Sequence, residues 1–116
     1  MVAPAPRRGE IYWTELNPVA GSEMAKTRPA LVVQNDTGNI YADTTIIVTI
    51  SSRQTSRSYP FLVAVPEGVF SRPSVINCAH VRTVDRARLK SGPVTRLDSD
   101  TMLAVDEALR ASLGLT

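Results

Sequence analysis

The chain has 116 residues, which is enough for one compact domain with its own core and too few for two ordinary domains. Apolar residues make up 43% of the sequence and charged residues 21%, and this balance excludes the disordered and membrane-spanning classes. The single cysteine excludes an intrachain disulfide, and one cysteine with one histidine cannot form a Cys/His zinc site. Met1 to Arg8 carry Ala and Pro where a signal peptide has its apolar stretch, so we expect a cytoplasmic protein.

The formal net charge is only +2, but the charges are unevenly distributed. Residues 1–90 carry 11 Lys and Arg against 7 Asp and Glu, whereas residues 91–116 carry 2 against 4. All the basic residues except Lys26 and Lys90 are arginines, and the planar guanidinium group binds phosphate through paired hydrogen bonds. This distribution suits a nucleic-acid partner, although a GC-rich genome would also enrich arginine.

The chain reads as a series of short β-strands separated by polar turns. Runs of β-branched and aromatic residues predict the strands, and Asn, Asp, Gly and Pro mark the turns between them. In chain order the predicted strands are Glu10 to Leu16, Arg28 to Gln34 with Pro29 at its start, Thr44 to Ile50, Phe61 to Val65, Val75 to Thr83, and Pro93 to Leu97. Polar loops are predicted at Val19 to Thr27 and Ser51 to Ser58, and short helical turns within Asn35 to Asp43 and Asp85 to Leu89.

One longer helix is predicted near the C-terminus. Asp98 is a suitable N-cap, Asp100 places an acidic group in the first turn, and Arg110 and Gly114 mark the end. The apolar residues recur at steps of three and four: Met102, Val105, Leu109 and Leu113. We expect this stripe to pack on the domain's own sheet, with a share in a dimer contact as the alternative. Short strands followed by one helix predict a small, mainly β barrel.

Few of the usual catalytic patterns occur in the sequence. The one histidine excludes a two-His ribonuclease mechanism within one chain, and the scattered acidic residues offer no obvious ligand set for two metal ions. RNA carries its own nucleophile, the ribose 2′-hydroxyl, so a protein needs only to move protons and to stabilise charge on the phosphoryl oxygens. An arginine together with a Ser or Thr hydroxyl can supply much of that stabilisation.

Several segments form a further pattern. In chain order they are Arg8 to Trp13 (RGEIYW), Asn17-Pro18, Gly21 to Glu23 (GSE), Arg28 to Asp36 (RPALVVQND), Pro73 to Ile76 (PSVI) and Val81 to Asp85 (VRTVD), followed by Arg88-Leu89. Each fragment alone is unspecific, but their order over residues 7 to 114 resembles the MazF/PemK/Kid family of toxins. The resemblance implies an SH3-like barrel of the PemK/CcdB-like kind, a homodimer, and a single toxin domain over residues 1–116 with a frayed start at residues 1–7.

The resemblance also implies an activity, a partner and two catalytic residues. Members of the family cut single-stranded RNA next to a short sequence motif, without metal or cofactor, and leave a 2′,3′-cyclic phosphate and a 5′-hydroxyl. Cognate antitoxins of the MazE type hold them inactive, and here a disordered acidic antitoxin tail would complement the basic body. By position, the catalytic arginine corresponds to Arg28 and the catalytic hydroxyl to Ser51. From the residues alone, Arg28 could instead pair with Glu23, and Ser51 could be a turn residue.

The remaining candidate residues are assigned to RNA binding: Ser22, Glu23, Asn35, Arg53, Gln54, His80 and Arg82. Ala79 and His80 stand where many family members have an acidic residue and Gln, so the family's base recognition does not carry over at this point. We expect His80 to read a base, with proton transfer and a bystander role as alternatives. Arg82 could hold phosphate or pair with Asp85, and Arg53 and Arg57 could follow the RNA backbone or belong to a solvated loop.

Two interpretations compete with the nuclease. A CcdB-like toxin that binds gyrase shares the fold, but its functional Trp in the C-terminal helix has no counterpart here, where the only Trp is Trp13. A non-catalytic RNA-binding barrel would not need Arg28 beside Ser51. Tyr12 and Trp13 point to opposite faces of the predicted first strand, so one belongs to the core and the other remains for base stacking. Cys78 is expected to be a packed small hydrophobe.

Overall fold

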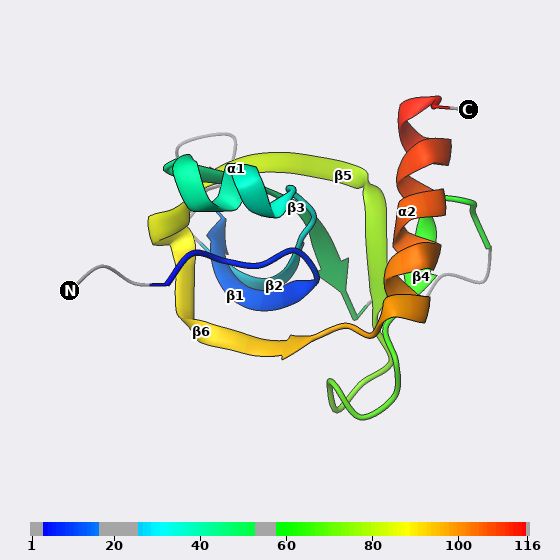
Figure 1. The fold of residues 1–116 in the computed structure, drawn as a ribbon. Helices are drawn as coiled ribbons and strands as arrows, with labels where there is room; N and C mark the ends of the chain where they lie inside the picture. The colour runs from blue at the N-terminus through cyan, green and yellow to red at the C-terminus, as the bar shows by residue number, and fades with distance from the viewer. Residues whose placement is uncertain (1–3, 17–25, 53–57, 116) are drawn as a thin grey trace.

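The computed structural model describes residues 4–16, 26–52 and 58–115. Its main element is a strongly curved antiparallel sheet of six strands in the order β4-β5-β3-β2-β1-β6 (Figure 1). β4 and β6 form the two edges, so within the described residues the barrel is open between them. The expectation of a mainly β, barrel-like domain with a C-terminal helix is confirmed.

The bounds of the elements follow the sequence prediction closely. The strands are β1 (Glu10–Leu16), β2 (Lys26–Val32), β3 (Thr44–Ser51), β4 (Leu62–Ala64), β5 (Val75–Asp85) and β6 (Leu89–Arg96). The helical elements are α1 (Asp36–Tyr41), the 3-10 turn η1 (Arg86–Arg88) and α2 (Ser99–Leu113). Every predicted strand and helical turn is present, and the bounds differ most at the start of β6, while β2 begins and ends two residues earlier than predicted.

Pro29 lies inside β2 instead of at its first residue, and the strand pairing explains why this is tolerated. Pro29 faces Trp13 of β1, whereas the pairing of β2 with β3 begins only at Ala30. β2 therefore has a partner on one side only at this point, and a residue without an amide hydrogen is accepted there. β6 begins at Leu89, four residues before the predicted start. Ser91 and Gly92 adopt positive φ angles of 63° and 78°, but they lie within the strand and do not precede it.

The curved sheet carries a buried cluster on each face. One cluster includes Ile11, Leu31, Val48, Ile76 and Val105, and therefore joins the sheet to α2. The other consists of Tyr12, Ala30, Val32, Ile47 and Val84. Consecutive residues of β1, β2 and β3 alternate between the two clusters, as the two-residue period of a strand requires.

α2 lies beside β5 and β4 (Figure 1). The predicted N-cap is confirmed, because Oδ2 of Asp98 accepts a hydrogen bond from the backbone N–H of Thr101 at 3.1 Å. The predicted end is confirmed as well, since Gly114 adopts a left-handed conformation with φ 71°. No helix in the described part of the chain is both long enough and apolar enough to cross a membrane.

The apolar stripe of α2 is buried only over its first turns. Val105 is fully buried, and Met102 and Leu109 pack against the core, as predicted. Leu113 was predicted to pack with them, but it is 56% exposed because the last turn of α2 extends beyond the sheet (Figure 1). Ala108, which the stripe did not include, is buried instead.

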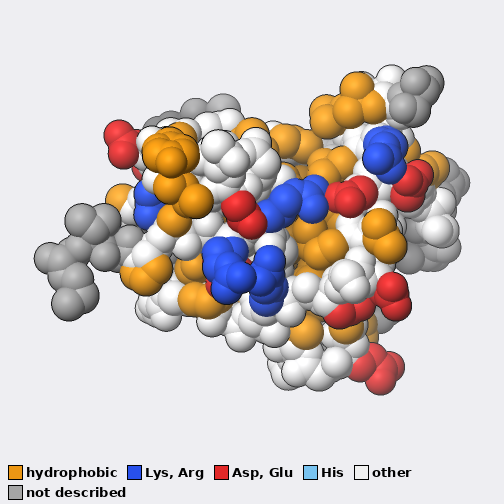
Figure 2. All heavy atoms as spheres, in the orientation of Figure 1, with side chains coloured by type: hydrophobic (Ala, Val, Ile, Leu, Met, Phe, Trp, Pro, Cys, Tyr) orange, Lys and Arg blue, Asp and Glu red, His pale blue; other side chains and the backbone are white. Residues whose placement is uncertain are grey.

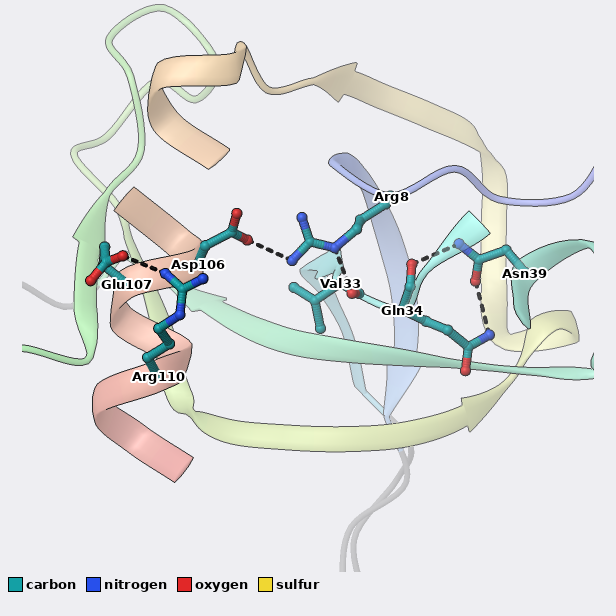
Figure 3. A network of polar contacts seen from close by, with 7 residues as sticks. All are labelled: Arg8, Val33, Gln34, Asn39, Asp106, Glu107 and Arg110. Carbon is teal, nitrogen blue, oxygen red and sulfur yellow. Dashed lines mark hydrogen bonds and ion pairs between the residues drawn. The ribbon is translucent and has the colours of Figure 1, made fainter. Parts of the chain in front are cut away.

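Arg8 connects the start of the domain to the residue after β2, to α1 and to α2, and Figure 3 shows the contacts with Val33 and with Asp106 of α2. Its Nε donates to the carbonyl oxygen of Val33 at 2.8 Å, and its Nη2 donates to Oδ1 of Asp106 on α2 at 2.7 Å. Its backbone N–H donates to Oδ1 of Asp36 at 2.7 Å, and this bond holds the pKa of the Asp36 carboxyl below its usual value. Basic and acidic side chains lie close together between the barrel and α2 (Figure 2). Because the Arg8–Asp106 pair is partly exposed, it orients α2 more than it stabilises the fold.

Asn39 is a fully buried polar residue of α1 and the centre of a hydrogen-bond network. Its Oδ1 accepts from Nε2 of Gln34 at 3.0 Å and from the hydroxyl of Thr45 at 2.7 Å (Figure 3 shows the Gln34 contact). Its Nδ2 donates to the backbone carbonyl of Gln34 at 3.0 Å and to Oδ1 of Asp36 at 3.3 Å. The network fastens α1 to the end of β2 and the start of β3.

A buried pair on β1 should make the stability of the fold depend on pH. Tyr12 donates its hydroxyl hydrogen to Oε1 of Glu10 at 3.0 Å, and burial, together with the bond to Glu10, raises the pKa of Tyr12 to about 12. The folded state thus holds the phenolic proton more tightly than the unfolded chain, whose pKa is 10.0. The stabilisation that the Tyr12 proton gives to the folded state is complete below pH 10.0 and is lost as the pH rises toward about 12. We expect a loss of about 2 to 3 kcal/mol over that range.

Urea unfolding of the wild type and of Tyr12→Phe across this pH range measures the effect. The Phe variant should lose less stability than the wild type over this range, because it has no phenolic proton to release, whereas the contribution of the buried Cys78 thiol is the same in both proteins. Tyr41→Phe is the matched control, since it removes an exposed tyrosine and keeps Tyr12. An equally steep loss of stability in the Tyr12→Phe variant would contradict the assignment.

Candidate active site

A pocket of about 570 Å³ lies where β2 begins and β3 ends. Arg28 and Ser51, the two residues predicted to be catalytic, both border it. Among the described residues around the pocket, Lys26, Arg28 and Arg72 are basic and none is acidic. The pocket therefore attracts an anionic group such as a phosphodiester.

Strand register explains why Arg28 and Ser51 come together. Ala30 of β2 faces Thr49 of β3, and Arg28 and Ser51 each lie two residues further along their strands toward the same end of the sheet. Because side chains alternate along a strand, these four residues lie on one face, which we call the Arg28 face. Ala30 is buried and Arg28 is exposed, so the Arg28 face emerges from the core at this end.

Aromatic residues form another side of the pocket. Trp13, which is 43% exposed, contacts Phe70 edge-to-face with ring centroids 6.2 Å apart. Tyr12 is the core member of the pair on β1, so the expectation that one of the two residues is buried is confirmed. Phe70 and Arg72, which also line the pocket, were not predicted from the sequence. The only available signal was the basic and aromatic composition of the segment before Pro73.

His80 lies in an irregular part of β5. Thr49 pairs with Asn77 while its neighbour Val48 pairs with Val81, so residues 78–80 have no partner on β3 and form a bulge. The side chain of Asn77 accepts a hydrogen bond from the backbone N–H of Ala79 at 3.0 Å, which stabilises the bulge. Nδ1 of the exposed His80 lies 3.3 Å from Oγ1 of Thr49, so the imidazole is on the Arg28 face.

The other predicted site residues are placed as follows. Asn35 lies beyond the opposite end of β2 and caps α1, where its Oδ1 accepts from the N–H of Gly38 at 2.8 Å. The structure therefore does not bring Asn35 to the pocket. Arg82 is half-buried on β5 opposite Ile47. Ser22, Glu23, Arg53 and Gln54 lie outside the described residues, and Lys26 and Ser52, which border the two gaps, line the pocket.

Among the described residues, Cys78 and the acidic side chains do not form a metal site or a second catalytic site. Cys78 is fully buried, and burial raises the pKa of its thiol to about 11, so the prediction of a packed hydrophobe is confirmed. Over the described ranges, no three His, Cys, Asp or Glu side chains group in a way that could hold a metal ion. A larger cavity of about 700 Å³ lies beside the N-terminal segment, but its three acidic residues outnumber its two basic ones, so it suits a phosphate less well; the charged lining residues are Glu10, Asp43, Asp85, Arg7 and Arg86.

Comparison with known proteins gives this geometry a family context. Endoribonuclease EndoA of Bacillus subtilis (strain 168) is 40% identical over 111 residues, which cover 94% of this chain and 95% of the relative. Among solved structures, MazE-MazF (Form-II) from Deinococcus radiodurans matches with a TM-score of 0.81 at 25% identity, over 98% of this chain and 100% of that chain. An endoribonuclease in complex with its cognate antitoxin from Mycobacterial species matches with a TM-score of 0.77 at 26% identity, over 97% and 98%.

The family described as "PemK-like, MazF-like toxin of type II toxin-antitoxin system" matches residues 7–113. That range begins just before Arg8 and ends at the last residue of α2, so it contains the whole sheet, both helices and the pocket. With the order of motifs, the fold and the full-length relative in agreement, the chain belongs to the family of PemK-like and MazF-like toxins.

Proposed function

We propose that this chain is an endoribonuclease toxin that cuts single-stranded RNA next to a short sequence motif, without a metal ion. The observation that carries the proposal is the position of Arg28 and Ser51, which border one pocket from neighbouring strands. The similarity to Endoribonuclease EndoA over nearly the whole chain supports the same activity. A gyrase-binding or purely RNA-binding role gives no reason for this pairing of a guanidinium with a hydroxyl.

In the proposed reaction the ribose 2′-oxygen attacks the adjacent phosphorus. A P–O2′ bond forms, the P–O5′ bond breaks, the 2′ proton leaves to a base, and the departing 5′-oxygen takes up a proton. The products are a 2′,3′-cyclic phosphate and a 5′-hydroxyl. Arg28 neutralises the charge that develops on the phosphoryl oxygens, and the Ser51 hydroxyl donates a further hydrogen bond to them. The role of the guanidinium is charge stabilisation, because its planar pair of donors matches two phosphoryl oxygens.

The proposed RNA-binding surface extends from this pocket onto β1 and β5. His80, on the Arg28 face, reads a base, and Trp13 at the pocket edge offers a surface for stacking. Arg82 holds phosphate, and Ser22, Glu23, Arg53 and Gln54 contribute from the segments that flank β2 and β3. Asn35 is the least supported of the predicted contacts, because its side chain caps α1.

The proposed regulation follows the neighbours of this chain in the structural comparison. The two solved structures compared above are an endoribonuclease in complex with its cognate antitoxin and MazE-MazF. We place this chain in the cytoplasm as a homodimer, held inactive by a cognate MazE-like antitoxin. The antitoxin's acidic segment would compete with RNA for the basic pocket.

Incubation of the purified protein with a defined single-stranded RNA in EDTA tests the proposal. We expect cleavage at one short motif, with cyclic-phosphate ends identified by mass spectrometry and 5′-hydroxyl ends identified by labelling with a kinase. Retardation of the RNA without cleavage would indicate a binding module instead. Cleavage only after addition of a divalent metal would reject the metal-independent mechanism.

A further inference from the structure

Thr49 has no role in the mechanism above, yet its side chain contacts the chain's only histidine. Oγ1 of Thr49 lies 3.3 Å from Nδ1 of His80. We propose that Thr49 is a positioning residue that holds the His80 imidazole by Nδ1 and directs Nε2 toward a base of RNA bound on the Arg28 face. The inference rests on the proposed function and specifies how its site selects a sequence.

Thr49 belongs to the most constrained part of the sheet. Its strand, β3, is paired on both sides, with Ala30 of β2 and Asn77 of β5 facing this residue. Its neighbours Val48 and Ile50 are buried in the core. A β-branched side chain on such a strand has few accessible rotamers, so the hydroxyl is held in a defined direction.

Within the described part of the chain, His80 is held less firmly than Thr49. It is exposed, and it lies in the bulge of β5, where residues 78–80 have no partner on β3. Two hydrogen bonds donated by backbone N–H groups hold the bulge in place. The N–H of Ala79 donates to the side chain of Asn77, and the N–H of Cys78 donates to the carbonyl oxygen of Phe61 at 2.9 Å. The backbone is thus fixed while the ring can still rotate, and the Thr49 hydroxyl removes that freedom.

The pair is also in the right place for base selection. Thr49 and Ser51 are two residues apart on β3 and therefore lie on the same face. A nucleotide whose phosphate sits between Arg28 and Ser51 has its neighbouring base within reach of His80 along this face. Because Nδ1 is occupied by Thr49, Nε2 is the ring atom that meets the base. An oriented contact discriminates between bases, whereas a rotating ring accepts several partners.

The first experiment observes the pair without using RNA. Because the chain has one histidine, long-range ¹H–¹⁵N spectra report the two ring nitrogens of His80 without ambiguity. Thr49→Val should change the Nδ1 shift and the balance of the two tautomers. Thr49→Ser keeps the hydroxyl and should restore the wild-type spectrum. Thr83→Val, an exposed threonine of β5 that faces Ile46, is the matched control and should change nothing.

The second experiment measures sequence choice with a library of single-stranded RNAs. Thr49→Val should lower the preference for the favoured base at one position by about fivefold, which is the effect expected for one hydrogen bond. Thr49→Ser should recover the preference, and Thr49→Val should have no further effect in a His80→Ala background. Unchanged ring signals in Thr49→Val, or independent effects of the two substitutions on base preference, would overturn the inference. If the wild type cuts no RNA, the proposed function fails, whereas the spectra still decide whether the pair exists.

Discussion

Substitution of Arg28 by alanine should reduce the rate of RNA cleavage by about 10²- to 10³-fold, the range found when one transition-state hydrogen-bond donor is removed. Arg28 is the basic residue of the pocket that lies closest in register to Ser51, so its loss leaves the phosphoryl charge without its main partner. Arg28→Lys should recover only part of the rate, because an ammonium group provides the charge without the planar pair of donors. Single-turnover cleavage of a short RNA containing the preferred motif measures both effects.

The fold should not change, because Arg28 is exposed at the start of β2. Arg110→Ala is the matched control: it removes an arginine that pairs with Glu107 on α2, and it should cut RNA at the wild-type rate. The double variant Arg28→Ala/Ser51→Ala should be little slower than Arg28→Ala alone, since residues that stabilise the same transition state act as a unit. An Arg28→Ala protein that cleaves at the wild-type rate would remove the central residue of the proposed mechanism.

Substitution of Asn39 by alanine should lower the free energy of unfolding by about 2 to 4 kcal/mol. The change removes four hydrogen bonds at once and leaves the fully buried hydroxyl of Thr45 without its acceptor. The Nε2 of Gln34 keeps one partner, the carbonyl of Thr44 at 3.0 Å, so the loss is smaller than four independent bonds would give. Urea unfolding followed by circular dichroism, at equal protein concentrations, measures the difference.

Thr37→Ala provides the comparison within the same helix. Thr37 is exposed on α1, so its substitution should change the free energy of unfolding by at most about 0.5 kcal/mol. Equal unfolding midpoints for the Asn39→Ala variant and the wild type would mean that the network does not stabilise the attachment of α1.

The presence of each element was predicted more accurately from the sequence than the residue at which it begins. β3 and α2 were found with nearly correct bounds, because an unbroken β-branched run and a capped amphipathic segment are strong local signals. The starts of β2 and β6 were missed for a common reason. Pro29 and Ser91-Gly92 look like the ends of strands, but whether they interrupt pairing depends on the neighbouring strand. The pairing of neighbouring strands belongs to the tertiary structure and is not visible in the local sequence. The same is true of Ala108, which is buried because the sheet lies against it and not because its side chain is strongly hydrophobic.

The residues of the candidate site that lie in family motifs were predictable from the sequence, and the others were not. Arg28 and Ser51 were identified from the family pattern, and the pairing of β2 with β3 brings them to one pocket. Phe70 and Arg72 come from a segment distant in sequence, so no local pattern could link them to Arg28. The contact between Thr49 and His80 depends on three unpaired residues in β5, and Asn77 was the only turn-forming residue that marked them.

The bulge in β5 has an implication for how this protein tolerates substitutions. Residues 78–80 make no ladder bonds to β3, while the paired stretches on either side keep their register. An exchange of an exposed side chain such as Ala79 or His80 therefore leaves the scaffold intact and alters only what the surface recognises. Under the proposed function, substitutions at these two positions would change the target preference with little effect on folding.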